Sequence, residues 1–291
     1  MKSNIVILTP VYNDWKNLEK LLEKINRIFY KRLKSKFELV VVNDCSKETY
    51  NYKKLKLKKI SKVSIISLYK NVGSQRAIAI GIRYLNNIYR KKKFITIIID
   101  SDGQDNPNVI SKLLSINKKK PSFSIAINRG QRKESNLFRI FYEIYCLMIR
   151  FFYFKKIRFG NFSLIVSNHL KKISNKSDLW CAFPPTLSKN INKIVHLTVN
   201  REKRYGGDSK MNFFGLIKHA WRVFAALRFR VLMSSIIYCI LSYFIFYEKY
   251  QFFFFFIFFS LLIFNILNFF QSFKNKNNFL VNYKKAKVKV L

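Results

Sequence analysis

The fold is decided by the stretch Phe94-Ile95-Thr96-Ile97-Ile98-Ile99-Asp100-Ser101-Asp102-Gly103-Gln104-Asp105. Five of its first six residues are apolar, as expected of a buried β-strand, and three of the chain's 15 carboxylates follow at once. Two of these, Asp100 and Asp102, lie two positions apart, so both could face one hard cation. Paired carboxylates of this kind bind Mg²⁺ or Mn²⁺ incompletely and leave positions for water and substrate phosphates. An Asx turn is the alternative, but the position after a buried strand in an acid-poor chain favours a metal site.

The composition is that of a large, strongly basic protein. The chain has 291 residues, 49% of them hydrophobic, and carries 55 Lys and Arg against 15 Asp and Glu, a formal charge of +40. The length and hydrophobic content exclude a disulfide-stapled peptide and a collagenous chain. The positive charge indicates an anionic partner such as nucleic acid, a nucleotide or phospholipid headgroups. A merely solvated basic face is the alternative. The four cysteines form no CxxC, and the apolar run at the N-terminus is too short for a signal peptide, so we expect this part in the cytoplasm.

Residues 1–99 alternate short apolar runs with helical patterns. The runs expected to form strands are Ile5–Leu8, Leu39–Val42, Val63–Leu68 and Phe94–Ile99, and those expected to form helices are Leu18–Phe29 and Ala77–Leu85. Such alternation predicts βαβ units with a mostly parallel sheet. In these sheets ligands bind beyond the carboxyl ends of the strands, so the residues that follow each strand are the candidates for chemistry.

Polar residues follow the other predicted strands as well. They are Thr9-Pro10-Val11-Tyr12-Asn13-Asp14, Asn43-Asp44-Cys45-Ser46 and Asn71-Val72-Gly73-Ser74-Gln75-Arg76. Gly73 permits close backbone approach, and Arg76 at a helix start could meet an anion, although a simple strand-to-helix turn explains this segment equally well. No GxxxxGK[ST] or GxGxxG motif is present, which argues against P-loop and dinucleotide-binding folds.

The C-terminal part reads as a membrane hairpin. Val231–Tyr247 and Phe252–Phe270 are almost wholly apolar and, at about 1.5 Å per residue, span roughly 25 to 29 Å, close to a hydrocarbon core of ~30 Å. Basic residues flank both spans, namely Arg222, Arg228, Arg230, Lys274, Lys276, Lys284, Lys285, Lys287 and Lys289, which predicts that both ends are cytoplasmic. A buried helical hairpin of a soluble protein is the alternative.

These patterns predict four segments. Residues 1–210 form a cytoplasmic catalytic domain, 211–230 an amphipathic juxtamembrane helix, 231–270 two transmembrane helices, and 271–291 a basic cytoplasmic tail. In the second segment, Ile217, Trp221, Phe224 and Leu227 recur at helical spacing while Lys218 and Arg222 take another face. We expect this helix to lie on an anionic leaflet, with a core helix as the alternative.

The strand-end motifs taken together resemble those of a known family. Pro10-Val11-Tyr12-Asn13-Asp14, Val42-Asn43-Asp44-Cys45-Ser46, Asn71-Val72-Gly73 and Asp100 to Asp105 are similar in type and order to the motifs of family 2 glycosyltransferases with the GT-A fold. Gln104-Asp105-Asn106-Pro107, the segment Arg204 to Lys210 and the hairpin resemble the branch that moves a sugar onto a polyprenyl phosphate. Dolichyl-phosphate mannosyltransferases and undecaprenyl-phosphate glucosyltransferases belong to this branch.

The resemblance implies a role for individual residues. Pro10, Tyr12 and Asp14 would frame the nucleotide pocket, and Asp44 would contact the base or ribose. Asp100, Asp102 and Gln104 would hold Mg²⁺ or Mn²⁺ and the diphosphate. Arg129 and Arg139 would lie near the acceptor phosphate, with Arg132 as a possible replacement for Arg129, and Arg204 matches the arginine ahead of the family's Gly-Glu-Ser-Lys motif.

The chain also departs from the family's pattern at three places. Asn43 stands for an Asp, Gly207-Asp208 for Gly-Glu, and Gly160-Asn161-Phe162-Ser163 for Gly-Asp-Phe-Arg. The last departure removes charged groups that could order the acceptor side, so donor and acceptor preference do not follow from the resemblance.

The function expected from the resemblance is inverting transfer of a sugar from a nucleotide-sugar to a polyprenyl phosphate at the cytoplasmic membrane face. A phosphate acceptor is ionised near neutral pH and needs positioning by arginines, whereas a hydroxyl acceptor needs a carboxylate base. Two alternatives stay open: a hydroxyl-directed family 2 enzyme of cell-envelope polysaccharide or glycolipid synthesis, and a non-enzymatic basic membrane protein that binds anionic lipid or nucleic acid. No nucleic-acid-binding motif is present, so we expect no nucleic acid partner. Sugar, base and oligomeric state do not follow from these patterns.

Overall fold

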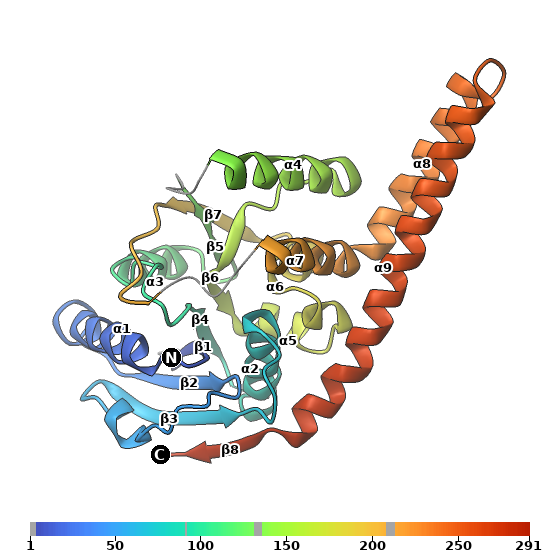
Figure 1. Cartoon of the computed structure of the whole chain (residues 1–291). Helices are drawn as coiled ribbons and strands as arrows, with labels where there is room; N and C mark the ends of the chain where they lie inside the picture. Colours follow the sequence, from blue (N-terminus) through green and yellow to red (C-terminus); the bar gives the residue numbers. More distant parts are fainter. Residues whose placement is uncertain (1–3, 91, 131–135, 208–212) are drawn as a thin grey trace.

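The computed structural model describes residues 4–90, 92–130, 136–207 and 213–291, and within them an eight-stranded mixed sheet (Figure 1). The strands are β1 (Asn4–Val11), β2 (Phe37–Asn43), β3 (Ile60–Ser67), β4 (Phe94–Ile98), β5 (Ser124–Arg129), β6 (Phe159–Val166), β7 (Ile194–Val199) and β8 (Lys287–Val290). Their order across the sheet is β7-β5-β6-β4-β1-β2-β3-β8.

The four strands predicted from residues 1–99 are confirmed, and they are parallel. Strand β1 lies between β2 and β4, with Val11 opposite Asn43 and Leu8 opposite Ile98. The carboxyl ends of these strands therefore meet at one edge of the sheet. Strands β6 and β8 run antiparallel to their neighbours, so the sheet is mixed, although most of its described pairings are parallel.

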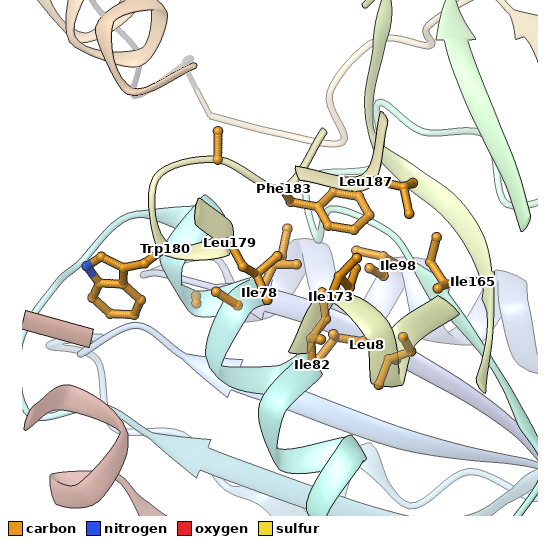
Figure 2. Close-up of a cluster of buried hydrophobic side chains, with 14 of the residues drawn as sticks. Leu8, Ile78, Ile82, Ile98, Ile165, Ile173, Leu179, Trp180, Phe183 and Leu187 are labelled. Carbon is orange, nitrogen blue, oxygen red and sulfur yellow. The ribbon is translucent and has the colours of Figure 1, made fainter. Parts of the chain in front are cut away.

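Alternating side chains of the strands build a core on each face of the sheet. Val6 and Leu8 of β1 pack with helices α2 (Ser74–Ile88), α5 (Ser167–Ser174) and α6 (Phe183–Asn190). Ile7, which points the other way, packs with α1 (Trp15–Ile28) and α3 (Val109–Lys119). Figure 2 shows side chains of the first core, among them Leu8, Ile82 and Phe183, meeting between the sheet and its helices. The result is a three-layer α/β domain.

Two long helices project from this domain as a hairpin (Figure 1). Helix α8 (Arg228–Phe246) and the part of α9 (Gln251–Lys285) up to Asn275 are long and apolar enough to cross a membrane. Large apolar side chains cover their outer surface, and Phe244 and Phe252 are 79% and 76% exposed. Exposure of an apolar surface of this extent to water would be unfavourable.

Helix α9 continues past Phe270 and returns to the sheet. The segment 271–291, predicted as a basic tail, is therefore built into the fold. Near the end of α9, Asn87 donates a hydrogen bond to the Tyr283 hydroxyl at 2.6 Å. Strand β8 then pairs antiparallel with β3, with Lys289 opposite Ile65.

Helices α4 (Asn136–Tyr153) and α7 (Phe213–Ala226) lie beside the base of the hairpin. The apolar stripe predicted to face lipid on 211–230 is divided in the structure: Ile217 is about half exposed, whereas Phe224 and Leu227 are buried. The core alternative holds for these two, because Phe224 packs against Phe152 of α4 and Phe264 of α9.

The outer surface of α4 is apolar and exposed. Large side chains along it, namely Ile140, Phe141, Ile144, Leu147, Met148 and Phe151, are 39% to 67% exposed. Phe151 stacks on Tyr238 of α8 with ring centroids 4.0 Å apart, and the Tyr238 hydroxyl donates to the Phe151 carbonyl at 2.6 Å. The exposed apolar face of α4 thus continues that of the hairpin.

We predict that the backbone hydrogen bonds between β8 and β3 hold the C-terminal end of α9 on the sheet. Val63 and Leu291 exchange both backbone hydrogen bonds, so the next exchanging pair of the antiparallel ladder is Ile65 and Lys289. Lys289→Pro removes that N–H and should lower the free energy of unfolding by about 1 kcal/mol, measured by thermal unfolding in detergent, and should speed amide exchange at Ile65.

Two control variants accompany this change. Lys289→Ala keeps the N–H, and Val288→Pro removes an N–H that points away from β3, so both should perturb the protein less. Equal effects of Lys289→Pro and Val288→Pro would contradict the assigned ladder.

Candidate active site

The edge where β1, β2 and β4 end carries most of the residues predicted to act. Each of the three turns contains a residue in the left-handed region: Asn13, Cys45 and Gly103, with φ of 47°, 61° and 80°. A Cβ at Gly103 would lie 2.4 Å from the Tyr205 ring, so this turn admits only glycine. These sharp turns keep the side chains that follow each strand at the sheet edge.

Hydrogen bonds tie the first two turns together. The Asp44 N–H donates to the Val11 carbonyl at 2.8 Å, and the Asn13 N–H donates to Ser46 Oγ at 2.9 Å. Pro10 is buried within β1, opposite Val42, and Tyr12 is half-buried just beyond the strand. The residues expected to frame a nucleotide pocket therefore lie on one rigid pair of turns.

Asp44 holds the turn that follows β3. Its carboxylate accepts the Val72 N–H at 2.7 Å and the Gly73 N–H at 2.8 Å. Burial raises the pKa of Asp44 to about 6, although the two N–H groups and the nearby Arg76 act in the opposite direction. Asp44 therefore organises the 71–73 turn, in addition to the ligand contact predicted for it.

Arg204 joins the turn after β1 to the turn after β4. Its guanidinium donates to Asp14 Oδ2 at 2.5 Å and to Asp102 Oδ2 at 3.3 Å, and its Nε donates to the Gly206 carbonyl. Asn17 donates to the other oxygen of Asp14 at 2.7 Å. Three predicted residues from distant parts of the chain, Asp14, Asp102 and Arg204, thus form one charge network.

Asp100, like Asp102, is partly buried, and its carboxylate accepts hydrogen bonds from a neutral side chain. It accepts hydrogen bonds from Asn161 Nδ2 at 3.0 and 3.3 Å, and Asn161 Oδ1 in turn accepts from Gln75 at 2.5 Å. Burial raises the pKa of Asp100, the charge of Asp102 raises it further, and the Asn161 hydrogen bond partly offsets both. Asn161, noted in the sequence only as a departure, therefore serves as a donor where an aspartate would add a repelling carboxylate.

Asn161, Gln75 and Arg201 are the site residues that the sequence reasoning missed. Arg201 lies near Asp100 and Asp105 and, like Arg129, opposes the rise in pKa that burial causes in both carboxyls. No local pattern marks these three residues as partners of the strand-end aspartates. The deviation at Asn161 was the one available signal.

The carboxylates of the site suit a hard divalent cation whose coordination shell is completed by substrate phosphates and water. Within the described residues, no group of three or more His, Cys, Asp or Glu side chains is arranged to hold a metal by itself. Asp102 is 16% exposed and accepts the Gln104 N–H with one oxygen. Mg²⁺ and Mn²⁺ commonly take only one or two carboxylates from the protein and the remaining ligands from phosphates and water. Asp100 and Asp102 meet that requirement.

A small pocket lies beside these aspartates, lined by Gln104, Asp105, Asn106, Ile127, Arg129, Gly160, Phe162, Val199, Asn200 and Arg201. Arg129 packs on Gly160 so closely that a Cβ there would lie 2.7 Å from Arg129 Nε. Arg129 and Gln104 are therefore brought together. The side chain of Arg139 on α4 lies outside the described part of the structure, as do Arg132 and residues 208–210.

Comparison with known proteins bears on this arrangement. The family model described as glycosyl transferase family 2 matches residues 6–245. No curated protein sequence matches the chain significantly.

Solved structures share the fold at low identity. Glucosyl-3-phosphoglycerate synthase from Mycobacterium tuberculosis, in complex with Mn²⁺, UDP-glucose and phosphoglyceric acid, superposes with a TM-score of 0.51 and 12% identity, over 78% of this chain and 79% of that one. S. aureus TarS 1–349 matches with a TM-score of 0.46 and 17% identity, over 79% of this chain. The chain spans 65% of the length of that TarS fragment.

We predict a pH dependence of stability that comes from Asp44. Its pKa is about 6 in the folded chain against 3.8 for an ordinary Asp, so the folded state binds the proton more tightly than the unfolded state. The stability due to this proton is fully present below about pH 4 and is lost as pH rises through about 6, a change of up to about 3 kcal/mol.

The measurement is the difference in free energy of unfolding between the wild-type chain and Asp44→Asn across pH 4 to 7. The wild-type advantage should shrink as pH rises, because the asparagine side chain of the variant does not titrate. A difference that is constant, or that grows with pH, would show that Asp44 is not the titrating group.

Proposed function

The chain belongs to glycosyltransferase family 2, and on this premise we propose that it transfers a sugar from a nucleotide-sugar to a polyprenyl phosphate, with inversion, at the cytoplasmic face of the cell membrane. The observation that carries the donor half is the meeting of Asp14, Asp102 and Arg204 at the carboxyl edge of parallel strands. Ligands of such sheets bind at this edge.

The donor diphosphate is proposed to lie at Asp102, with Asp100 and Gln104 beside it and Pro10, Tyr12, Asp14 and Asp44 around the nucleoside. Bound Mg²⁺ or Mn²⁺ would neutralise the charge that develops on the departing nucleoside diphosphate. The fold neighbour glucosyl-3-phosphoglycerate synthase holds Mn²⁺ together with UDP-glucose, a ligand set that the carboxylates here also suit. Arg204 is placed to share Asp102 with a diphosphate, because guanidinium groups bind both carboxylates and phosphates.

A phosphate acceptor suits the charges around the site. Four described carboxylates at the strand ends are already engaged: Asp14 and Asp102 with Arg204, Asp44 with backbone N–H groups and Asp100 with Asn161. The exception is Asp105 in the small pocket, whose pKa burial raises to about 7. A hydroxyl acceptor would require one of these carboxylates as base, whereas an ionised phosphate needs only positive charge to position it. Arg129, with Arg139, is proposed to supply that charge.

The apolar helices support a membrane location. The hairpin α8–α9 and the exposed face of α4 form one apolar surface, and the basic residues that flank the hairpin favour a cytoplasmic position for both of its ends. The amphipathic segment 211–230 would lie at the boundary between the catalytic domain of residues 1–210 and the lipid.

The test is an assay of the full chain, in detergent or nanodiscs, with a panel of sugar nucleotides, Mn²⁺ and membrane-extracted polyprenyl phosphate. We expect a lipid-linked sugar whose anomeric configuration is opposite to that of the donor. Transfer to lipid alcohols or polysaccharide alone would favour the hydroxyl-directed alternative. Salt-sensitive polyanion binding, without stabilisation by any nucleoside diphosphate, would favour the non-enzymatic one.

Asp102→Asn should abolish transfer, by at least a thousandfold, because one neutral amide cannot replace a carboxylate on the metal and diphosphate. It should also lose the Mn²⁺-dependent rise in melting temperature that a nucleoside diphosphate produces in the wild-type chain. Glu23→Gln, at an exposed carboxylate on α1, removes the same charge and should keep both. Wild-type turnover by Asp102→Asn without metal would refute the metal role.

Gly160→Ala should raise the KM for the acceptor without changing the KM for the donor, because its methyl group displaces the Arg129 guanidinium. Initial rates at varied polyprenyl phosphate measure the effect. In a double-mutant cycle, Gly160→Ala should add little to Arg129→Ala, since both act on the same group. Additive effects would mean that Gly160 does not act through Arg129.

A further inference from the structure

Three helices from distant parts of the chain meet where the hairpin joins the catalytic domain: the start of α2, α7 and the domain side of α9. Two arginines extend into this junction. Arg222 of α7 places Nη1 3.8 Å from the position of a Cβ at Gly73, just before α2. Arg76 of α2 donates to Asn275 Oδ1 of α9 and lies over the Trp180 ring at 5.3 Å.

Among the residues that the structure describes, neither arginine forms a direct ion pair with a carboxylate, and Asp44 acts on Arg76 only from a longer distance. Several other partly buried cations do form ion pairs: Asp178 pairs with both Lys189 and Arg228, and Arg204 pairs with two aspartates. The Nε atoms of Arg76 and Arg222 are buried, and within the described ranges they have no hydrogen-bond acceptor. Burying unpaired charges is costly, so this junction has positive charge that a ligand could balance.

The electrostatics agree with that geometry. Burial and the charge of Arg222 together lower the pKa of Arg76 to about 10, although Cys181 and Asp44 act in the opposite direction. Burial also lowers the pKa of Arg222. Two guanidinium groups that repel each other in a poorly solvated junction are stabilised by an anion between them.

His219 lies near this junction and also near Arg129 of the small pocket described above. His219 lies one turn before Arg222 on α7, so the two side chains share a helix face. Burial lowers the pKa of His219 to about 4, and the nearby charges of Arg129 and Arg222 act in the same direction. His219 is therefore neutral at pH 7 and lies near both Arg129 and Arg222.

We propose that Arg76 and Arg222 bind the phosphate group of the lipid acceptor. Guanidinium groups bind phosphate oxygens in a bidentate manner, and α9, which contributes Asn275, leads directly from the candidate membrane span to this junction. The inference rests on the proposed function, and it adds Arg76 and Arg222 to Arg129 and Arg139, the residues that the family resemblance associates with the same phosphate.

The first experiment measures initial rates of the full chain with Arg76→Gln, Arg222→Gln and the control Lys218→Gln. Lys218 is exposed on the same helix as Arg222, so its substitution removes an equal charge outside the junction. We expect at least a tenfold higher KM for polyprenyl phosphate in both arginine variants, with the donor KM within twofold of wild type. Lys218→Gln should change neither KM more than twofold.

The opposite split would overturn the proposal. A higher KM for the nucleotide-sugar with an unchanged lipid KM would assign the pair to the donor diphosphate. No change in either KM would leave the pair without a role in substrate binding.

A second experiment separates this inference from the proposed function, because it needs no turnover. Citronellyl phosphate, a short polyprenyl phosphate, should raise the melting temperature of the wild-type chain without donor, and Arg222→Gln should lose that rise. Inorganic phosphate at the same concentration should stabilise less. Equal stabilisation by inorganic phosphate would overturn the lipid assignment. If no sugar transfer to lipid occurs but the Arg222-dependent rise persists, the proposed function fails and the site stands.

The ligand-free melting temperature distinguishes a binding role from a structural one. If the two arginines serve to bind an anion, their mutual repulsion lowers the stability of the ligand-free protein, and substitution removes that repulsion. Ligand-free Arg222→Gln should therefore melt at or above the wild-type temperature. Arg222→Lys keeps the charge without the bidentate geometry and should show a lipid KM between those of wild type and Arg222→Gln. A fall in the ligand-free melting temperature of both Arg222 variants, with lipid KM unchanged, would identify Arg222 as structural.

Discussion

Parallel pairing of β1 with β2 and β4 is the constraint on which the candidate site depends. Because these strands run in one direction and are in direct contact, their carboxyl ends reach the same edge, and the turn after each contains a residue with its backbone in the left-handed region. A register slip of one residue would exchange buried and exposed faces along a whole strand. The contact of Arg204 with both Asp14 and Asp102 exists because the strands hold those two aspartates side by side.

The charge balance of the chain explains how its buried polar groups are arranged. Carboxylates are scarce, with 15 against 55 Lys and Arg, and those described at the strand ends each have cations or N–H groups as partners. Cations exceed the carboxylates available, so some partly buried arginines form no direct ion pair among the described residues: Arg201 beside the small pocket, and Arg76 and Arg222 at the junction of α2, α7 and α9. The proposed phosphate acceptor would supply the negative charge that the composition lacks.

The C-terminal hairpin is part of the same structural unit as the catalytic sheet. Helix α9 passes from its apolar half to a polar half that contacts the domain through Asn275 and Tyr283, and β8 then completes the sheet beside β3. Helix α4 adds its exposed apolar face next to α8. These contacts hold the apolar surface in one orientation relative to the strand-end aspartates, so a lipid substrate would meet the site from a defined direction.

The features that depend on neighbouring residues were predictable from the sequence: β1 to β4 as apolar runs, the aspartates that follow β4, and the two long apolar helices. Strand β8 was missed because its exposed Lys-Val-Lys-Val carries no burial signal. Only the tertiary structure decided the partners. Arg204 meets Asp14 across 190 positions, Asn161 meets Asp100 across 61, and Arg76 meets Asn275 across 199. Such contacts follow from the packing of whole layers, whose free energy is summed over the chain. The residues next to either partner in the sequence therefore carry no pattern that predicts the contact.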